Sequence, residues 1–358
     1  MNLSALGPIA VAFPEHVETA DELYQQYPQW DMPLIREKTG VNRRHVTSPD
    51  ECASDLAVRA AERLFEEYGI DRNSIDFLLF CTQSPDYILP TTACVLQHRL
   101  GLPKTIGAFD FNLGCSGFVY GLGIADGLIR AGAKRILLLT AETYTKYIHP
   151  GDRSLRTIFG DGAAATLVVA QENLPGQPAP ETSFHAFSYS TDGSGADLLI
   201  VTEGGARKEN RIKPRKRKRW ASDLYMAGPE LVRFTLERVP GTVHSLLEQA
   251  GWTAEELSYY LFHQATAYML ENLVACMKIP MEKVPFCMED YGNTVSSTIP
   301  ILIRQLRKAG RLRPGMKNIM VGFGVGLSSA GAAWTERFTE PDAAIQATNG
   351  SDASPTAR

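Results

Sequence analysis

Short apolar runs alternate with helix-like segments along the chain. A continuous apolar run is typical of a strand that is covered on both faces. Helices placed between such strands favour an α/β fold with a largely interior sheet. The runs predict strands over 75–80, 109–111, 135–139 and 164–169, and the segments beside them predict helices over 91–100 and 116–131.

One strand–loop–helix rhythm occurs twice. Residues 69–94 correspond to 251–276 at an offset of 182, and residues 114–132 correspond to 292–310 at an offset of 178. Chance similarity could produce one such match, but two consecutive blocks in the same order favour a duplicated α/β unit. We expect an N-terminal half over 1–175, a connecting and basic segment over 176–219, a C-terminal half over 220–340 and a disordered tail over 341–358.

Composition excludes several classes of protein. Of the 358 residues, 44% are hydrophobic and 21% are charged, which supplies a sizeable core and argues against a mostly disordered chain. A net charge of −4 gives no bulk attraction to nucleic acid. No run of about 18 apolar residues predicts a membrane-spanning helix. The N-terminus also lacks the basic region of a signal peptide. We therefore expect neither nucleic acid nor membrane as a partner.

The cysteines favour a reducing compartment. None of the six forms a CxxC pair, and none lies with histidines at zinc spacing, so we expect no metal. Cysteines this sparse in a long chain also argue against a disulfide framework, which fits the cytoplasm. The six are Cys52, Cys81, Cys94, Cys115, Cys276 and Cys287.

Cys115 is the cysteine best placed to act as a nucleophile. It lies where an extended apolar run ends and a helix begins, between small neighbours that let a substrate approach the backbone. The positive end of a helix dipole stabilises a thiolate. An isolated cysteine is more often a buried structural residue, so its role depends on the residues around it.

Two polar residues lie at equivalent junctions. His263 directly follows the expected strand 257–262, and Asn293 lies just before a helix. Through the repeat, Asn293 falls opposite Cys115, and equivalent loops of two fused halves would converge at one site. Alone, His263 is typical of a hydrogen-bonded structural histidine and Asn293 of a helix cap. Together with Cys115 they suit nucleophilic acyl transfer, which needs a thiolate and donors for an oxyanion.

Two glycine-rich stretches have different interpretations. Residues 159–164 lack both the Gly-x-Gly-x-x-Gly fingerprint and the lysine of a P-loop, so we expect no nucleotide cofactor. Residues 322–329 follow an expected strand. They either form a tight turn or bring backbone N–H groups close to a ligand.

Five motifs follow one another along the chain. They are Gly-Cys-Ser-Gly-Phe at 114–118, Phe-Gly-Asp-Gly-Ala-Ala at 159–164, His-Gln-Ala at 263–265, Tyr-Gly-Asn-Thr at 291–294 and Gly-Phe-Gly-Val-Gly at 322–326. With them, the chain from about Leu3 to Phe338 resembles the ketoacyl synthase III enzymes of the thiolase-like superfamily. The resemblance implies a duplicated five-layer αβαβα fold and a homodimer. It also implies acyl thioesters of coenzyme A or a carrier protein as substrates, with no bound cofactor.

The resemblance also implies roles for particular residues. Cys115 would take the acyl group from a thioester. His263 and Asn293 would stabilise the enolate that forms when a malonyl thioester loses CO₂. The backbone N–H groups of Cys115 and Val325 would form a second oxyanion hole. Leu89 would lie where the family lines the acyl pocket across the dimer interface.

The chain departs from the family at positions that bind the donor. Thr266 and Tyr268 stand where the family usually has an asparagine and an arginine that helps to dock the carrier. Leu34 stands in place of a tryptophan that stacks on adenine, and Lys38 takes a position often held by arginine, while Arg153 is retained. The chemistry is therefore expected to be intact and donor recognition altered, which favours a specialised, secondary-pathway enzyme.

A basic segment lies outside the repeat. Residues 207–219 contain nine basic residues and one acidic residue. Such a run is most often a solvated loop, and binding of nucleic acid or other anions is a minor alternative. The sharper alternative is docking of an acidic carrier protein, because clustered charge speeds encounter with an acidic partner. The residues concerned are Arg215, Lys216, Arg217, Lys218 and Arg219.

The main hypothesis is an acyltransferase that forms an acyl-Cys115 intermediate and condenses it with a malonyl-type thioester, releasing CO₂. One alternative keeps the acyl-enzyme but transfers the acyl group to a hydroxyl or an amine. An alternative of another class is a non-catalytic partner subunit that retains the fold.

Overall fold

Two sheets with the same strand order form the body of the molecule. The computed structural model describes residues 3–171, 182–206 and 223–341. The first sheet has the order β1-β7-β6-β4-β5, and the second has the corresponding order β8-β13-β12-β11. The four strands common to both sheets pair alike: β4 with β6 and β11 with β12 are parallel, and the other corresponding pairs are antiparallel. The first sheet has one further strand, β5, which lies parallel to β4. This agreement supports the duplication that the sequence predicts.

The predicted strands of the first half are all present. Those at 75–80, 109–111, 135–139 and 164–169 lie within or overlap β4, β5, β6 and β7. The first sheet consists of β1 (Leu3–Ala12), β4 (Phe77–Cys81), β5 (Gly107–Phe111), β6 (Arg135–Glu142) and β7 (Gly162–Gln171). The second consists of β8 (Phe184–Thr191), β11 (Leu257–Phe262), β12 (Lys317–Gly324) and β13 (Ser328–Thr335).

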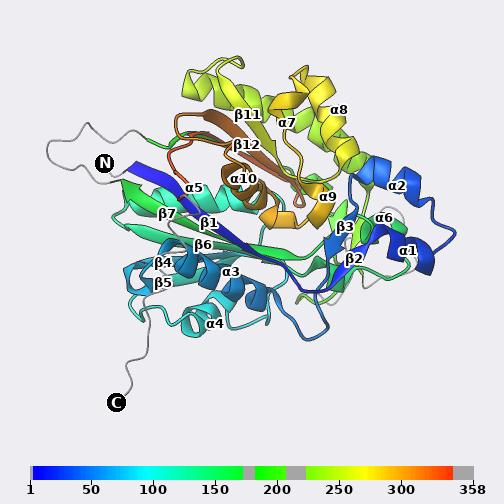
Figure 1. The fold of residues 1–358 in the computed structure, drawn as a ribbon, viewed down its shortest axis with the longest axis horizontal. Helices are drawn as coiled ribbons and strands as arrows, with labels where there is room; N and C mark the ends of the chain where they lie inside the picture. The colour runs from blue at the N-terminus through cyan, green and yellow to red at the C-terminus, as the bar shows by residue number, and fades with distance from the viewer. Residues whose placement is uncertain (1–2, 172–181, 207–222, 342–358) are drawn as a thin grey trace, which may run out of the picture.

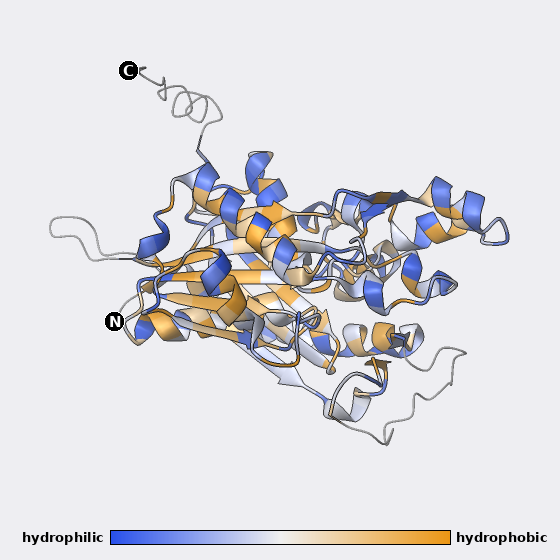
Figure 2. Cartoon of the chain, turned by 90° about the horizontal axis from the view of Figure 1, so that it is seen from below, coloured by the Kyte–Doolittle hydropathy of each residue, from blue (hydrophilic) through white to orange (hydrophobic). Residues whose placement is uncertain are grey.

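Two helices form the central layer between the sheets. They are α5 (Gly117–Arg130) and α10 (Thr298–Lys308). Phe118 of α5 and Leu302 of α10 belong to one buried cluster that also contains Leu79 of the first sheet and Met320 of the second. Figure 1 shows the sheets on either side of these helices, and Figure 2 shows that hydrophobic residues concentrate in the strands.

The outer faces of the sheets are covered by further helices, which completes the predicted five layers. On the first sheet these are α3 (Ala53–Tyr68) and α4 (Thr92–Arg99). On the second they are α7 (Gly228–Ala250) and α8 (Ala267–Met277). Continuous apolar strands require such covering on both faces. The fold is therefore thiolase-like, as the sequence predicts.

Smaller elements form a lobe beside the strand ends that carry the site residues (Figure 1). This lobe contains β2 (Val17–Thr19), β3 (Arg43–His45), α1 (Ala20–Gln26), α2 (Met32–Thr39), α6 (Arg153–Arg156) and α9 (Met288–Tyr291). A separate two-stranded ribbon pairs β9 (Leu199–Ile200) with β10 (Tyr225–Met226).

The predicted connecting segment over 176–219 is wrong in part. Residues 184–191 form β8, which pairs with β13 and belongs to the second sheet. This strand corresponds to β1 of the first sheet, so the second half begins with a strand that the sequence comparison placed outside it. The basic residues 207–219 and the tail residues 342–358 lie outside the described residues.

The constant offset of 182 is also wrong beyond the strands. Gly69 and Gly251 do correspond, because each ends a helix in a left-handed conformation. Helix α4, however, begins at Thr92, whereas α8 begins at Ala267, because the loop after β4 is longer than the loop after β11. The offset of 178 holds, and it pairs α5 with the segment 295–308.

Candidate active site

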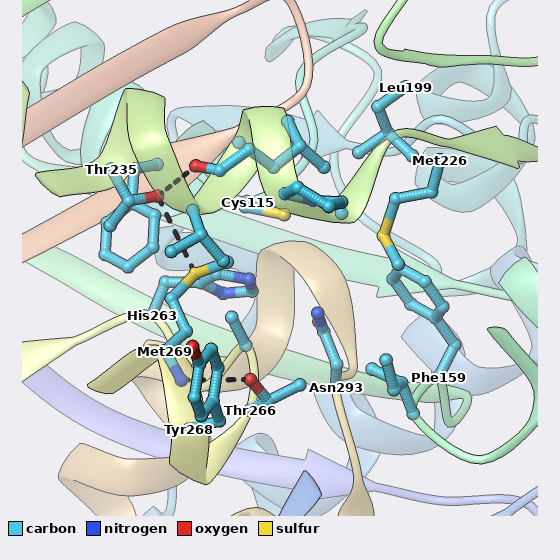
Figure 3. Close-up of a pocket in the computed structure, with 18 residues that line it drawn as sticks. Cys115, Phe159, Leu199, Met226, Thr235, His263, Thr266, Tyr268, Met269 and Asn293 are labelled. Atoms are coloured by element: carbon cyan, nitrogen blue, oxygen red, sulfur yellow. Dashed lines mark hydrogen bonds between the residues drawn. The ribbon is translucent and has the colours of Figure 1, made fainter. Parts of the chain in front are cut away.

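Three predicted residues from different parts of the chain line one cavity of about 490 Å³ (Figure 3). Cys115 lies two residues before α5 in the first half. His263 directly follows β11, and Asn293 precedes the 3₁₀ turn 295–297 that leads into α10. The duplicated halves therefore bring corresponding junctions to a single site.

The Cys115 thiol lies against the backbone of β12. The side chain is 5% exposed. Gly324, at the end of β12, has a φ of +154°, and a Cβ there would lie 2.9 Å from the Cys115 Sγ. Because glycine lacks that atom, the chain can continue past the sulfur. The backbone N–H groups of Val325 and Cys115 lie near enough to the sulfur to lower its pKa, against the larger effect of burial.

Its position at a helix N-terminus does not by itself make Cys115 a thiolate in the free protein. Burial, with a smaller contribution from the Glu142 charge, raises the pKa of the Cys115 thiol from 9.0 to about 12. That rise corresponds to about 4 kcal/mol, whereas a helix end contributes at most about 2 kcal/mol. Burial therefore outweighs the helix, although the predicted position at its N-terminus is confirmed.

Glu142, which the sequence analysis did not single out, is a fully buried carboxyl near the thiol. Its oxygens accept hydrogen bonds from the backbone N–H of Gln83 at 3.0 Å, from the Ser84 hydroxyl at 2.8 Å and from the Ser296 hydroxyl at 3.0 Å. Burial nevertheless raises the pKa of Glu142 to about 8. The carboxyl is therefore mostly neutral at pH 7, so it adds little negative charge beside Cys115.

His263 is an uncharged imidazole in this environment. The side chain is buried, and burial lowers its pKa from 6.5 to about 3. The ring packs nearly perpendicular to the ring of Phe323, with 5.6 Å between ring centroids. The Nδ1 atom lies 2.7 Å from the Oγ1 atom of Thr298, the first residue of α10. A neutral ring can act in the cavity through one nitrogen only.

The Asn293 side chain presents its amide nitrogen to the cavity. Its Oδ1 atom accepts a hydrogen bond of 2.9 Å from the Val295 N–H, which leaves the NH₂ group free to face inward (Figure 3). The backbone is held across the two halves as well. Asn293 N–H donates to the Ile158 carbonyl at 2.8 Å, and Gly160 N–H donates to the Asn293 carbonyl at 3.1 Å. Hydrogen bonds of the side chain and of the backbone therefore both fix the position of the Asn293 NH₂ group.

The other predicted binding residues are divided between the cavity and the surface. Thr266 and Tyr268 line the cavity, and Thr266 caps α8 by accepting from the Met269 N–H at 3.2 Å. Lys38, Arg153 and Leu89 do not line this cavity, and all three are exposed. Of these five predicted residues, only Thr266 and Tyr268 therefore lie in the cavity wall.

Most of the cavity wall is apolar and was not predicted. These residues come from separate segments, and apart from Phe159 they lie outside the five motifs, so their contact in space identifies them. They include Ile158, Phe159, Leu199, Met226, Leu231, Val232 and Met269. Such a wall suits a thioester arm that carries few charges.

Among the described residues, His, Cys, Asp and Glu side chains form no group that could hold a metal ion. In the same part of the chain, no helix has both the length and the apolar character needed to cross a membrane.

Comparison with known proteins assigns the chain to a family. Residues 109–202 match the family 3-oxoacyl-[acyl-carrier-protein (ACP)] synthase III, and residues 247–335 match its C-terminal part. The beta-ketoacyl-[acyl-carrier-protein] synthase III 2 of Halalkalibacterium halodurans is 33% identical over 340 residues, which is 94% of this chain and 98% of that protein.

Solved structures agree. A 3-oxoacyl-(acyl-carrier-protein) synthase III has 44% identity and a TM-score of 0.87, over 93% of this chain and 99% of that chain. The synthase from Burkholderia xenovorans LB400 has 33% identity and a TM-score of 0.87, over 95% of this chain and 96% of that chain. The fold and these matches define a thiolase-like acyltransferase. The chain belongs to the 3-oxoacyl-[acyl-carrier-protein] synthase III family.

The close approach of β12 to the thiol can be tested at Gly324. Gly324→Ala would place a methyl group against the Cys115 Sγ, so we expect alkylation of Cys115 by iodoacetamide to slow by about 10²-fold, as misplacement of a reacting group by 1 Å can do. Peptide mass spectrometry measures the rate. Gly251→Ala is the control, because Gly251 also has a positive φ but no atom within 4 Å of its Cβ position. Equal rates in both variants would contradict the proposed contact.

Proposed function

We propose that the protein condenses an acyl group, held on Cys115, with a malonyl-type thioester and releases CO₂. The observation that carries the proposal is the arrangement of donors around one buried thiol. Two backbone N–H groups lie near the sulfur, while His263 and Asn293 line the same cavity from the other half. The names of the relatives, 3-oxoacyl synthases, agree with a product of this kind.

The first step forms the acyl-enzyme. The Cys115 sulfur attacks the thioester carbonyl, a new S–C bond forms, the old C–S bond breaks, and the thiol proton passes to the leaving thiol. The N–H groups of Cys115 and Val325 lie beside the sulfur, so they are near the carbonyl oxygen that becomes the oxyanion, and they stabilise its charge. Because the free thiol has a pKa of about 12, proton loss and attack are expected to occur together.

The second step forms the carbon–carbon bond. The malonyl thioester loses CO₂, and its carbonyl becomes an enolate that accepts hydrogen bonds from His263 and Asn293. The enolate carbon attacks the acyl carbon, the S–C bond to Cys115 breaks, and the thiolate takes up a proton. The product is a 3-oxoacyl thioester.

Two alternatives remain distinguishable from this proposal. Transfer to a hydroxyl or amine needs Cys115 but no donor pair for an enolate, so Asn293 separates it from condensation. A non-catalytic subunit needs no reactive thiol at all. The cavity of about 490 Å³ that reaches Cys115 favours an enzyme.

The donor would reach Cys115 through the apolar cavity. Tyr268 is half exposed at its wall, beside Thr266, and these residues replace the usual polar and basic pair of the family. Lys38 and Arg153 lie exposed in the lobe, where they could bind phosphate groups of a carrier or coenzyme. Docking of a carrier on residues 215–219 stays a prediction from the sequence.

A homodimer is supported by one exposed apolar loop. Tyr87, Ile88 and Leu89 are 59%, 86% and 80% exposed, although a monomeric protein rarely leaves consecutive large apolar residues in water. Strand β5 lies at the edge of the first sheet beside this face. A second copy would cover the loop, and Leu89 would then contact the partner's acyl pocket.

The nucleophile can be tested directly. Cys115→Ser should abolish formation of the acyl-enzyme, because a serine hydroxyl at this buried position stays protonated and is a weaker nucleophile. Intact-mass spectrometry after incubation with a panel of acyl thioesters measures the mass gain. Cys94→Ser, a change at an exposed cysteine, should acylate normally. Acylation of the Cys115→Ser protein would disprove the assignment.

The two steps can be separated at Asn293. Asn293→Ala should leave acylation largely unchanged and slow the malonyl-dependent step by about 10²–10³-fold, as the loss of one oxyanion donor does. Single-turnover measurements of acylation and of CO₂ release give the two rates. Normal CO₂ release would reject condensation and favour transfer to a hydroxyl or amine.

The dimer can be tested at the exposed loop. Leu89→Asp should convert a dimer to a monomer in sedimentation, because burying an unpaired carboxylate in an apolar interface is unfavourable. Met281→Asp is a matched control, since Met281 is also exposed at 47% but lies outside the loop. A monomeric wild-type protein, or a Leu89→Asp dimer of unchanged stability, would contradict the interface.

A further inference from the structure

The position of one hydrogen atom on His263 decides what the ring can do. Because burial keeps the imidazole neutral, only one of its two nitrogens carries hydrogen. With hydrogen on Nε2, the ring donates to an oxygen anion in the cavity. With hydrogen on Nδ1, Nε2 carries a lone pair and repels such an anion. The two forms therefore differ in function at the same geometry.

Thr298 is the hydrogen-bond partner that the structure gives to Nδ1. Its Oγ1 atom lies 2.7 Å from Nδ1 and 3.2 Å from the carbonyl oxygen of Val295, and the side chain is 2% exposed. A hydroxyl has one hydrogen, so it can donate to only one of these acceptors. The 2.7 Å contact can run in either direction, and donation by the hydroxyl to Nδ1 is the choice that leaves hydrogen on Nε2.

The neighbouring Asn293 supports the same choice. Its Oδ1 accepts from the Val295 N–H, so its NH₂ group is the part that faces the cavity. An enolate oxygen is only an acceptor, and it can bind both side chains only if Nε2 also carries hydrogen. Nδ1 is then a bare, buried acceptor, and it requires a donor.

We propose that Thr298 is a positioning residue that sets the tautomer of His263. Its hydroxyl donates to Nδ1, so that Nε2 keeps its hydrogen and faces the cavity as a donor. The consequence for catalysis rests on the proposed condensation, whereas the tautomer is a property of the free protein. The thiol proton of Cys115 then does not pass to Nε2, which agrees with its transfer to the leaving thiol.

One turn of backbone orients both donors. Val295 donates its N–H to Asn293 Oδ1, and its carbonyl oxygen lies 3.2 Å from the Thr298 Oγ1 atom. It has a φ of +56°, which is rare and strained for a β-branched residue. Contacts to the first half hold this turn in place. Ser296 donates to Glu142 at 3.0 Å, and the hydroxyls of Ser297 and Thr140 lie 2.8 Å apart.

The tautomer can be measured without any substrate. Nitrogen-15 NMR of histidine-labelled wild-type protein distinguishes a bare from a protonated ring nitrogen. The chain has seven histidines, so His263→Gln identifies the signal by its loss. We expect a bare Nδ1 and a protonated Nε2 at neutral pH. A protonated Nδ1 in the wild-type protein would overturn the proposal.

Substitution then tests whether Thr298 causes this tautomer. Thr298→Val keeps the shape and removes the hydroxyl, so we expect hydrogen to appear on Nδ1. Malonyl-dependent CO₂ release should fall by about 10–100-fold, less than the full loss of a donor, while acylation changes by less than about threefold. Thr298→Ser, which restores the hydroxyl, should recover the wild-type tautomer and most of the rate. An unchanged tautomer in Thr298→Val would overturn the proposal.

A matched control separates positioning from stability. Thr242 is also buried, and its hydroxyl donates to a backbone carbonyl at 3.2 Å, but it lies on α7 outside the cavity wall. Thr242→Val should leave the tautomer and both rates unchanged. Equal loss in both steps for Thr298→Val and Thr242→Val would indicate a structural role and reject positioning. If Asn293→Ala leaves CO₂ release normal while the tautomer is as expected, the condensation fails and the role of Thr298 in setting the tautomer stands.

Discussion

The close packing of β12 against the start of α5 is the constraint on which the site depends. Side chains larger than hydrogen at Gly322 and Gly324 would collide with the backbone or the sulfur of Cys115. With glycine there, the second half approaches closely enough for the Val325 N–H to reach the sulfur. The same approach lets Ser296 donate to Glu142 at 3.0 Å and brings the hydroxyls of Ser297 and Thr140 to 2.8 Å. These contacts hold His263 and Asn293 in position relative to Cys115.

The same packing excludes water from the site and thereby shifts the pKa values of three groups. Burial raises the pKa of Cys115 to about 12 and that of Glu142 to about 8, and it lowers the pKa of His263 to about 3. All three groups are therefore mostly neutral at pH 7. A site of neutral groups stabilises charge through oriented hydrogen-bond donors, which are stronger where water is excluded. Negative charge that forms during a reaction is then stabilised only where these hydrogen-bond donors can bind it.

Local patterns in the sequence identified three polar residues that meet in the cavity. The strand-to-helix junction at Cys115, the strand end at His263 and the offset of 178 that pairs Asn293 with Cys115 are all properties of short segments, and the structure brings these residues together. Comparison by a constant offset failed where the loops differ in length, at α4 and α8, and it missed β8. Loop length is set by what a loop contacts, so a sequence repeat does not preserve it.

The sequence by itself therefore determined the class of fold and the three residues that meet in the cavity, Cys115, His263 and Asn293, because each follows from periodicity and motif within a few residues of chain. Only the tertiary structure decided how those groups behave. Whether Cys115 is a thiolate depends on burial, which outweighs the helix end. The partner of His263 Nδ1, Thr298, lies 35 residues further along the chain and is found only by its distance of 2.7 Å. Burial and contact distances depend on segments that are far apart in the sequence, so no local pattern predicts them.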